Sequence, residues 1–219
     1  MDPSQISRTS SVARAGAKPL VLGVNSVYHQ SAAALIHGGE VLFAIEEERL
    51  SRVRYAKAAR VDNAGVLPWA AIDACLHAGH VRLRDLDGIA LSFRPGRRQG
   101  TLGRDPYPLA PGGFGTPEGE ARFDADVRHL PELFAERGGD PSVAERVHFI
   151  AHHRAHAAGA FYSAPFPRAA VLVLDGIGED AAGWLGRGAG RDLSVLEEIP
   201  YPHSLGLLWE RIAIFCGFG

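Results

Sequence analysis

Three histidines lie within five residues of one another, at His152, His153 and His156. His152 and His156 are four residues apart, so on a helix both imidazoles lie on one face and can share one cation. Asp175 ends an apolar run and is followed by Gly176, which allows close backbone approach. A carboxylate at the end of a strand is well placed to complete a site of two histidines and one carboxylate. The spacing leaves open the alternative that the histidines are ordinary surface or capping residues.

The segment Asp175-Gly176-Ile177-Gly178-Glu179 is a glycine-rich turn after a predicted buried strand. Such a turn exposes backbone N–H groups to a phosphate, although an ordinary hairpin turn has the same composition. His29 lies between the first predicted strand and the next. It is either a structural histidine or a general base for a hydroxyl nucleophile.

Charged side chains follow the third predicted strand, in Glu46-Glu47-Glu48-Arg49 and then at Arg52 and Arg54. This pattern indicates either a solvated turn or a pair of arginines that face a phosphate or carboxylate. Ser204 and Gly206 begin the last apolar segment. Ser204 is a candidate N-cap, and the same backbone could offer N–H groups to an anion.

The first half of the chain contains the strands and helices that must position these residues. Apolar runs joined by a Gly-Gly turn predict a meander of three strands, and helical spacing of apolar residues follows it. The predicted elements are strands at Leu20–Asn25, Ser31–Ile36, Val41–Ile45 and Leu86–Phe93, helices at Pro68–Ala78 and Asp126–Arg137, and a long surface loop at Arg94–Gly119. Cys75 lies on the apolar side of its helix and is expected in the core.

The second half is predicted to form more strands and two helices. Val147–Ile150 and Val171–Leu174 are expected strands, His153–Tyr162 and Leu205–Phe218 are expected helices, and Gly183–Leu185 pairs with Leu193–Ile199. The last helix is apolar, and no later segment could cover it. We therefore expect a domain that is truncated at its C-terminus.

The composition is that of a globular protein, with 46% hydrophobic and 22% charged residues among 219. Residues 1–18 are polar and predicted to be a disordered leader, so order is expected over 19–219. No apolar run reaches the length of a membrane span, and a net charge of −2 gives no indication of nucleic-acid binding. Two cysteines, Cys75 and Cys216, are expected as reduced thiols in the cytoplasm.

Together these segments resemble the carbamoyltransferase family, which includes nodulation-type and antibiotic-tailoring O-carbamoyltransferases. The resemblance covers about residues 20–219. Its motifs are Gly23-x5-His29-x-Ser31-Ala32-Ala33, Glu47-Glu48-Arg49-x-x-Arg52, His152-His153-x-x-His156-Ala157, Leu174-Asp175-Gly176-x-Gly178-Glu179 and Ser204-Leu205-Gly206. Five ordered motifs are far more specific than any one of them.

The resemblance implies an α/β domain of the actin/Hsp70-like type, built on a ribonuclease H-like core. In such enzymes a YrdC-like domain makes carbamoyladenylate from ATP and carbamoyl phosphate, and the actin-like domain passes the carbamoyl group to a substrate hydroxyl beside a metal, iron or zinc. By resemblance, His152, His156 and Asp175 match the metal ligands, and His29 matches the base that deprotonates the acceptor. The nucleotide or its carbamoyl group would face Arg54, Asp175, Gly176, Ser204 and Gly206.

The sequence departs from the family pattern at three places. Gln30 follows His29 where an aspartate is common, Arg54 stands where a lysine is usual, and the segment 94–119 aligns poorly and is expected to shape acceptor choice. The second half of the domain and the YrdC-like domain are not found in this sequence. We therefore expect a small-molecule hydroxyl acceptor and a second chain that supplies the missing half. The alternatives are an inactive fragment or binding subunit, or another actin-like ATP-dependent transferase.

Overall fold

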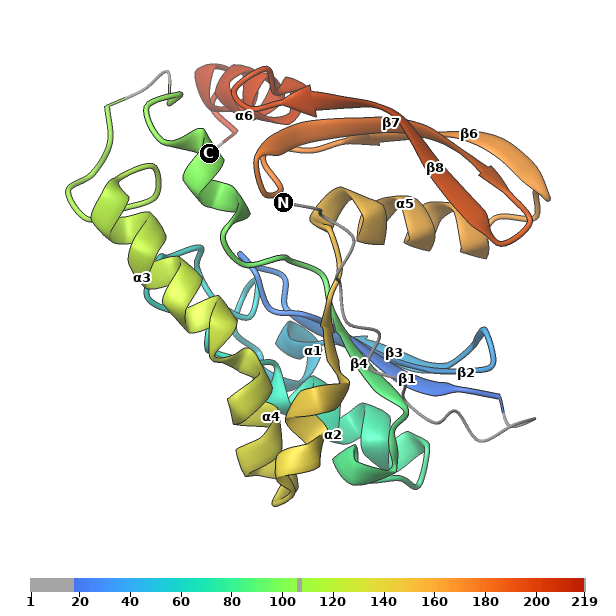
Figure 1. The fold of residues 1–219 in the computed structure, drawn as a ribbon. Helices are drawn as coiled ribbons and strands as arrows, with labels where there is room; N and C mark the ends of the chain where they lie inside the picture. The colour runs from blue at the N-terminus through green and yellow to red at the C-terminus, as the bar shows by residue number, and fades with distance from the viewer. Residues whose placement is uncertain (1–17, 106–107, 219) are drawn as a thin grey trace, which may run out of the picture.

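The computed structural model describes residues 18–105 and 108–218, and within these ranges the chain forms eight strands and six α-helices (Figure 1). The strands are β1 Leu20–Asn25, β2 Ala32–His37, β3 Glu40–Glu46, β4 Gly88–Leu91, β5 Val147–Phe149, β6 Arg168–Leu174, β7 Ala181–Ala189 and β8 Asp192–Pro200. The helices are α1 Glu47–Ser51, α2 Trp69–Ala78, α3 Pro117–Arg128, α4 Leu130–Gly138, α5 His152–Ser163 and α6 Leu205–Phe215.

A mixed five-stranded sheet has the order β3-β2-β1-β4-β5. The first three strands form the predicted antiparallel meander, while β4 and β5 run parallel to β1. A meander followed by parallel strands on its far side is the strand arrangement of a ribonuclease H-like core. The expected α/β class is confirmed.

The first core lies between this sheet and α2. Side chains alternate along β1 and β2 so that Leu22, Val24 and Leu35 are buried, and α2 contributes Ile72 and Cys75. Cys75 is therefore a core residue, as predicted. Burial of each large aliphatic side chain contributes about 1.5–3 kcal/mol.

A separate antiparallel sheet has the order β6-β7-β8, and α5 covers one of its faces. Figure 1 shows α5 between the two sheets. Phe161 of α5 packs with Val173 and Trp184, and a Cβ at Gly188 would meet the Phe161 ring at 2.4 Å. The close contact of helix and sheet therefore needs glycine there.

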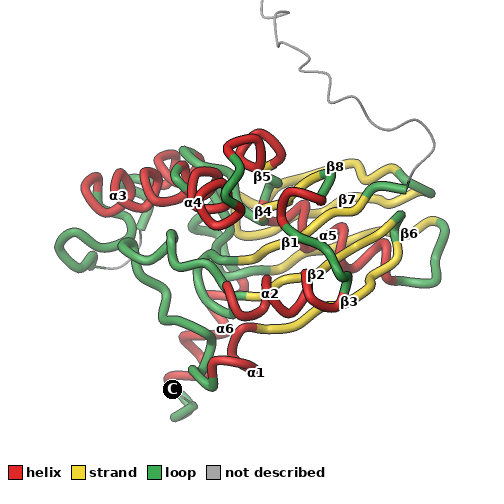
Figure 2. Tube along the Cα trace, turned by 90° about the horizontal axis from the view of Figure 1, so that it is seen from below, coloured by secondary structure: helices red, strands yellow, loops and turns green. Residues whose placement is uncertain are grey.

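The segment predicted as one loop and one helix is organised differently. The expected loop at Arg94–Gly119 contains a 3₁₀ helix, Arg97–Thr101, and the first residues of α3. The prediction of a single helix at Asp126–Arg137 is wrong, because this range holds the end of α3, at Arg128, and most of α4, which begins at Leu130. Proline lacks an N–H and fits the first turn of a helix, so Pro131 favours a new start there. Figure 2 shows α3 at one end of the molecule and α4 between α3 and the strands.

Residues 1–17, which make up most of the predicted leader, lie outside the described residues. Among the residues that are described, no helix combines the length and hydrophobicity needed to cross a bilayer.

Candidate metal centre

Helix α5 places His152 and His156 on one face, as their spacing predicts. His152 is the first helical residue, and its ring Nδ1 lies 3.1 Å from the carbonyl oxygen of Ser92. Because a carbonyl only accepts hydrogen bonds, Nδ1 carries the proton there. This hydrogen bond leaves Nε2 of His152 as the ring nitrogen that faces Asp175 and that would bind a metal.

Asp175 follows the last residue of β6 and meets both histidines. Its Oδ2 lies 3.0 Å from Nε2 of His152 and 3.9 Å from Nε2 of His156, and the two Nε2 atoms are 3.1 Å apart. One ligand atom from each residue lies within 4.8 Å of the other two, and no other group of three such side chains does so among the described residues. The structure therefore brings together the three residues that the sequence predicts as ligands.

The donors fit a divalent transition metal. Two imidazoles and one carboxylate are the ligand set preferred by iron(II) and zinc. Burial lowers the pKa of His156, which favours the neutral imidazole that can serve as a ligand. Burial alone would raise the pKa of Asp175, but its contacts with His152 and His153 outweigh burial and hold that pKa well below the usual range.

His153 is a fourth side chain aimed at this group. Its ring is buried, and Nε2 lies 3.3 Å from Oδ2 of Asp175 without a hydrogen-bond partner. A Cβ at Gly178 would lie 2.9 Å from ring atoms of both His152 and His153. Gly178 thus leaves room for the two rings, and a buried polar nitrogen beside a ligand carboxylate is consistent with a metal site.

The start of α6 packs against the turn that carries Asp175. Ser204 is the N-cap of α6, as predicted: its Oγ accepts from the N–H of Leu207 and donates to the carbonyl of Asp175 at 2.8 Å. A Cβ at Gly206 would lie 2.5–2.6 Å from backbone atoms of Asp175 and Gly176. The predicted residues Asp175, Gly176, Ser204 and Gly206 are therefore in one place.

The centre opens into a cleft of about 990 Å³ between the two sheets. His29 lies exposed at this cleft, in the bend between β1 and β2, and the cleft is also lined by His152, His156 and Asp175. Tyr28, beside His29, donates from its hydroxyl to the carbonyl of Gly178 at 2.7 Å. Burial raises the pKa of Tyr28, so its hydroxyl stays protonated as a donor. This hydrogen bond links the β1–β2 segment to the turn that carries Asp175.

Arg52 and Arg54 follow α1 and are exposed. Arg52 ends α1 in a left-handed conformation, and Nη2 of Arg54 donates to the hydroxyl of Tyr55 at 2.6 Å. Neither arginine is among the described residues that line the cleft. A contact between Arg54 and a nucleotide stays a prediction.

Sequence reasoning missed the groups that orient the ligands. Ser92 acts through its backbone carbonyl, which carries no sequence signal. His153 and Glu179 belong to the sequence motifs, but no role was predicted for them. Their positions could have indicated one, because His153 is directly beside the predicted ligand His152 and Glu179 is directly beside the turn glycine Gly178.

The family model described as "Carbamoyltransferase N-terminus" matches residues 20–110 and 132–219. The chain is 32% identical over 206 residues to the uncharacterised protein sll1178 of Synechocystis sp., and 31% identical over 196 residues to the nodulation protein NolNO of Sinorhizobium fredii. These alignments cover 90% and 89% of this chain but only 32% and 26% of the two relatives. Among solved structures, YeaZ from Pseudomonas aeruginosa aligns with a TM-score of 0.42 and 15% identity, over 83% of this chain and 68% of that one.

Proposed function

Because this chain belongs to the carbamoyltransferase family and matches its N-terminal region, we propose that it takes part in transferring a carbamoyl group to a hydroxyl of a small-molecule acceptor. The carbamoyl donor is carbamoyladenylate, which forms from ATP and carbamoyl phosphate. The observation that carries the proposal is the group His152, His156 and Asp175 on the wall of a cleft that His29 also lines.

His152, His156 and Asp175 would hold the metal, iron or zinc. When bound there, the metal supplies Lewis acidity, which makes a carbonyl more electrophilic and stabilises negative charge on its oxygen. Ser204 and Gly206 keep the turn at Asp175 close to the start of α6. The N–H of Gly176 donates to Oδ1 of Asp175 at 2.7 Å and so helps to orient this ligand, whereas the start of α6 is suited to hold the donor's phosphate or carbamoyl oxygen.

His29 accepts the proton of the attacking hydroxyl. Its exposure at the cleft lets the acceptor reach it from solvent, and an imidazole accepts a proton near neutral pH. The hydroxyl oxygen forms a bond to the carbamoyl carbon, and the bond from that carbon to the phosphate oxygen of AMP breaks. AMP leaves readily because its phosphate is a stable anion.

We also propose that another polypeptide segment completes the domain. The chain spans about a third and a quarter of the two relatives. The face of the second sheet opposite α5 exposes Leu172 and Leu174, and α6 has no buried residue among those described. Such an apolar surface fits a covering polypeptide that carries the rest of the domain.

Metal content and donor binding test the proposal together. We expect about one iron or zinc per purified chain, and loss of the metal in His152→Ala/His156→Ala. A non-hydrolysable carbamoyladenylate analogue should bind more tightly to the metal-loaded chain than to the metal-free chain, as measured by isothermal titration calorimetry.

A matched control is the double variant His77→Ala/His80→Ala, which removes two exposed imidazoles elsewhere in the fold whose ring centroids are 6.2 Å apart. It should keep the metal. A folded wild-type chain without metal, or equal metal content in the two double variants, would contradict the assignment of the site.

A further inference from the structure

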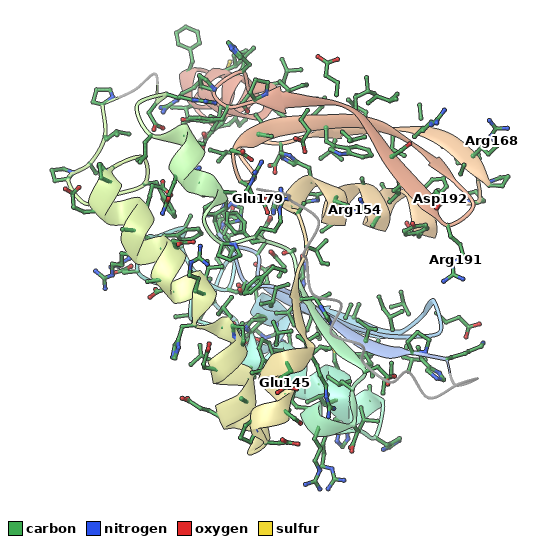
Figure 3. All side chains as sticks on the ribbon, viewed as in Figure 1. Glu145, Arg154, Arg168, Glu179, Arg191 and Asp192 are labelled. Carbon is green, nitrogen blue, oxygen red and sulfur yellow. The ribbon has the colours of Figure 1, made fainter. Side chains whose placement is uncertain are left out.

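The turn that carries Asp175 also carries a buried carboxylate with a different set of partners. Glu179 is 4% exposed, and its two oxygens accept hydrogen bonds from three separate groups. These are the backbone N–H of Arg94 at 2.7 Å, the guanidinium of Arg94 at 2.5 Å and 2.9 Å, and the backbone N–H of His152 at 3.3 Å. Figure 3 labels Glu179 near the start of α5.

The contact with His152 lies at the first turn of the helix that carries the metal histidines. The N-cap of α5, Ala151, has no side chain that could accept a hydrogen bond from the helix. The first N–H groups of a helix have no partner within it, and a carboxylate there also interacts favourably with the helix dipole. The carboxylate of Glu179 therefore serves as the missing cap, supplied by a residue 27 positions away in sequence.

We propose that Glu179 is a positioning residue for the metal centre. It caps α5 at His152. Through the three residues that connect it to Asp175, it also sets the distance between the helix that supplies two ligands and the turn that supplies the third. Arg94 holds the carboxylate in place. The proposal rests on the metal site of the proposed function but assigns a role to a residue outside it.

A neighbouring ion pair provides a control, because it joins the same two segments as Glu179 and Arg94 but does not contact α5. Asp180, the next residue, pairs with Arg97 at 2.8 Å. Both pairs join the segment after β4 to the β6–β7 turn, but only Glu179 is hydrogen-bonded to α5. If Glu179 only joined those two segments, loss of either ion pair would lower the metal affinity by a similar factor.

The test compares Glu179→Ala, Glu179→Gln and Asp180→Asn in the full chain, with Co²⁺ as a spectroscopic probe of the site. Arg94 is 38% exposed, so water can solvate its charge and Glu179→Ala is expected to fold. We expect Co²⁺ affinity to fall by about 10- to 100-fold in Glu179→Ala, with a changed visible spectrum. Glu179→Gln keeps one acceptor oxygen, so its Co²⁺ affinity should lie between those of Glu179→Ala and wild type. Asp180→Asn should stay within about twofold of wild type.

Hydrogen exchange separates a failure of this proposal from a failure of the metal site. In Glu179→Ala the amide of His152 should exchange faster, with or without metal, while amides in the middle of α5 stay protected. Unchanged Co²⁺ affinity in folded Glu179→Ala, or an equal loss in Asp180→Asn, would overturn the positioning role. If the wild-type chain binds no Co²⁺ but the amide of His152 exchanges faster in Glu179→Ala, the assignment of the metal site is wrong. Glu179 is then a helix cap without a role in metal binding.

Discussion

At the scale of single residues, the centre depends on how closely the histidine rings are packed. Gly178 has no side chain, and the rings of His152 and His153 occupy the space that a Cβ would need. Gly159 is on the same helix as His152 and His156 but has open space around it. These two glycines therefore respond to the same substitution in opposite ways.

We expect Gly178→Ala to weaken metal binding by about tenfold, because the added methyl group displaces both rings from their positions. Gly159→Ala should keep the metal affinity and raise the free energy of unfolding by about 0.5–1 kcal/mol, because alanine favours a helix over glycine. Calorimetric titration measures the metal affinity of both variants, and thermal unfolding measures their stability. Equal metal affinity in the two alanine variants would show that ring packing does not control the site.

Lys57 is a buried amine, and its hydrogen-bond partners are backbone carbonyls. Its Nζ donates to the carbonyls of Asn63 at 2.6 Å and Val66 at 2.9 Å, and burial lowers its pKa to about 8. Below pH 8 both the folded and the unfolded chain are protonated at this amine, so the cost of burying the charge is present in full. As the pH rises through 8 the folded chain loses the proton first, and the unfolded chain then binds more protons.

The free energy of unfolding should therefore rise by about 2 kcal/mol between pH 8 and 10. Urea unfolding followed by tryptophan fluorescence at several pH values measures it. Lys57→Met should lack this rise, and Lys18→Met, which changes the only other lysine, should keep it. If the free energy of unfolding of Lys57→Met rises with pH as it does in wild type, a group other than Lys57 causes the rise.

At the scale of elements, strands and their turns could be predicted because their signals are local. Alternating apolar residues around Gly38-Gly39 correctly place β2 and β3, and the spacing from Pro68 correctly places α2. The start of α3 was missed although Thr116 and Pro117 form an N-cap and first helical residue. Gly119 obscured that signal. A Cβ at this glycine would lie 2.0 Å from the carbonyl of Gly113, so glycine is needed for a packing reason that sequence does not reveal.

The candidate site was predictable to the extent that helical geometry determines it. The spacing of His152 and His156 places both rings on one face of any helix. The distance from Asp175 to these rings depends instead on how β6 packs on α5, and on contacts such as Ser204 to the carbonyl of Asp175. Such contacts join residues distant in sequence, so the sequence predicted Asp175 only as a carboxylate at a strand end, and the family resemblance made its link to the two histidines specific.

At the scale of the whole molecule, apolar side chains gather on one side of the second sheet and on α6. On β6 the side chains alternate, so that Val171 and Val173 pack on α5 while Leu172 and Leu174 are 59% and 51% exposed. Trp209 and Phe215 of α6 are 76% and 91% exposed. An exposed apolar surface of this kind marks an interaction site or a tendency to associate.

The chain on its own should therefore self-associate as its concentration rises and should bind the dye ANS. Trp209→Ser/Phe215→Ser should reduce both effects, because association buries these side chains. The same change should alter the free energy of unfolding of the monomer by less than about 0.5 kcal/mol, since both side chains are already in water. Val41→Ser, at a 64% exposed valine on β3, is the matched control and should leave association unchanged. Sedimentation equilibrium measures the association. A wild-type chain that stays monomeric and does not bind ANS would argue against a covering polypeptide, because its apolar surface would then be stable in water without a partner.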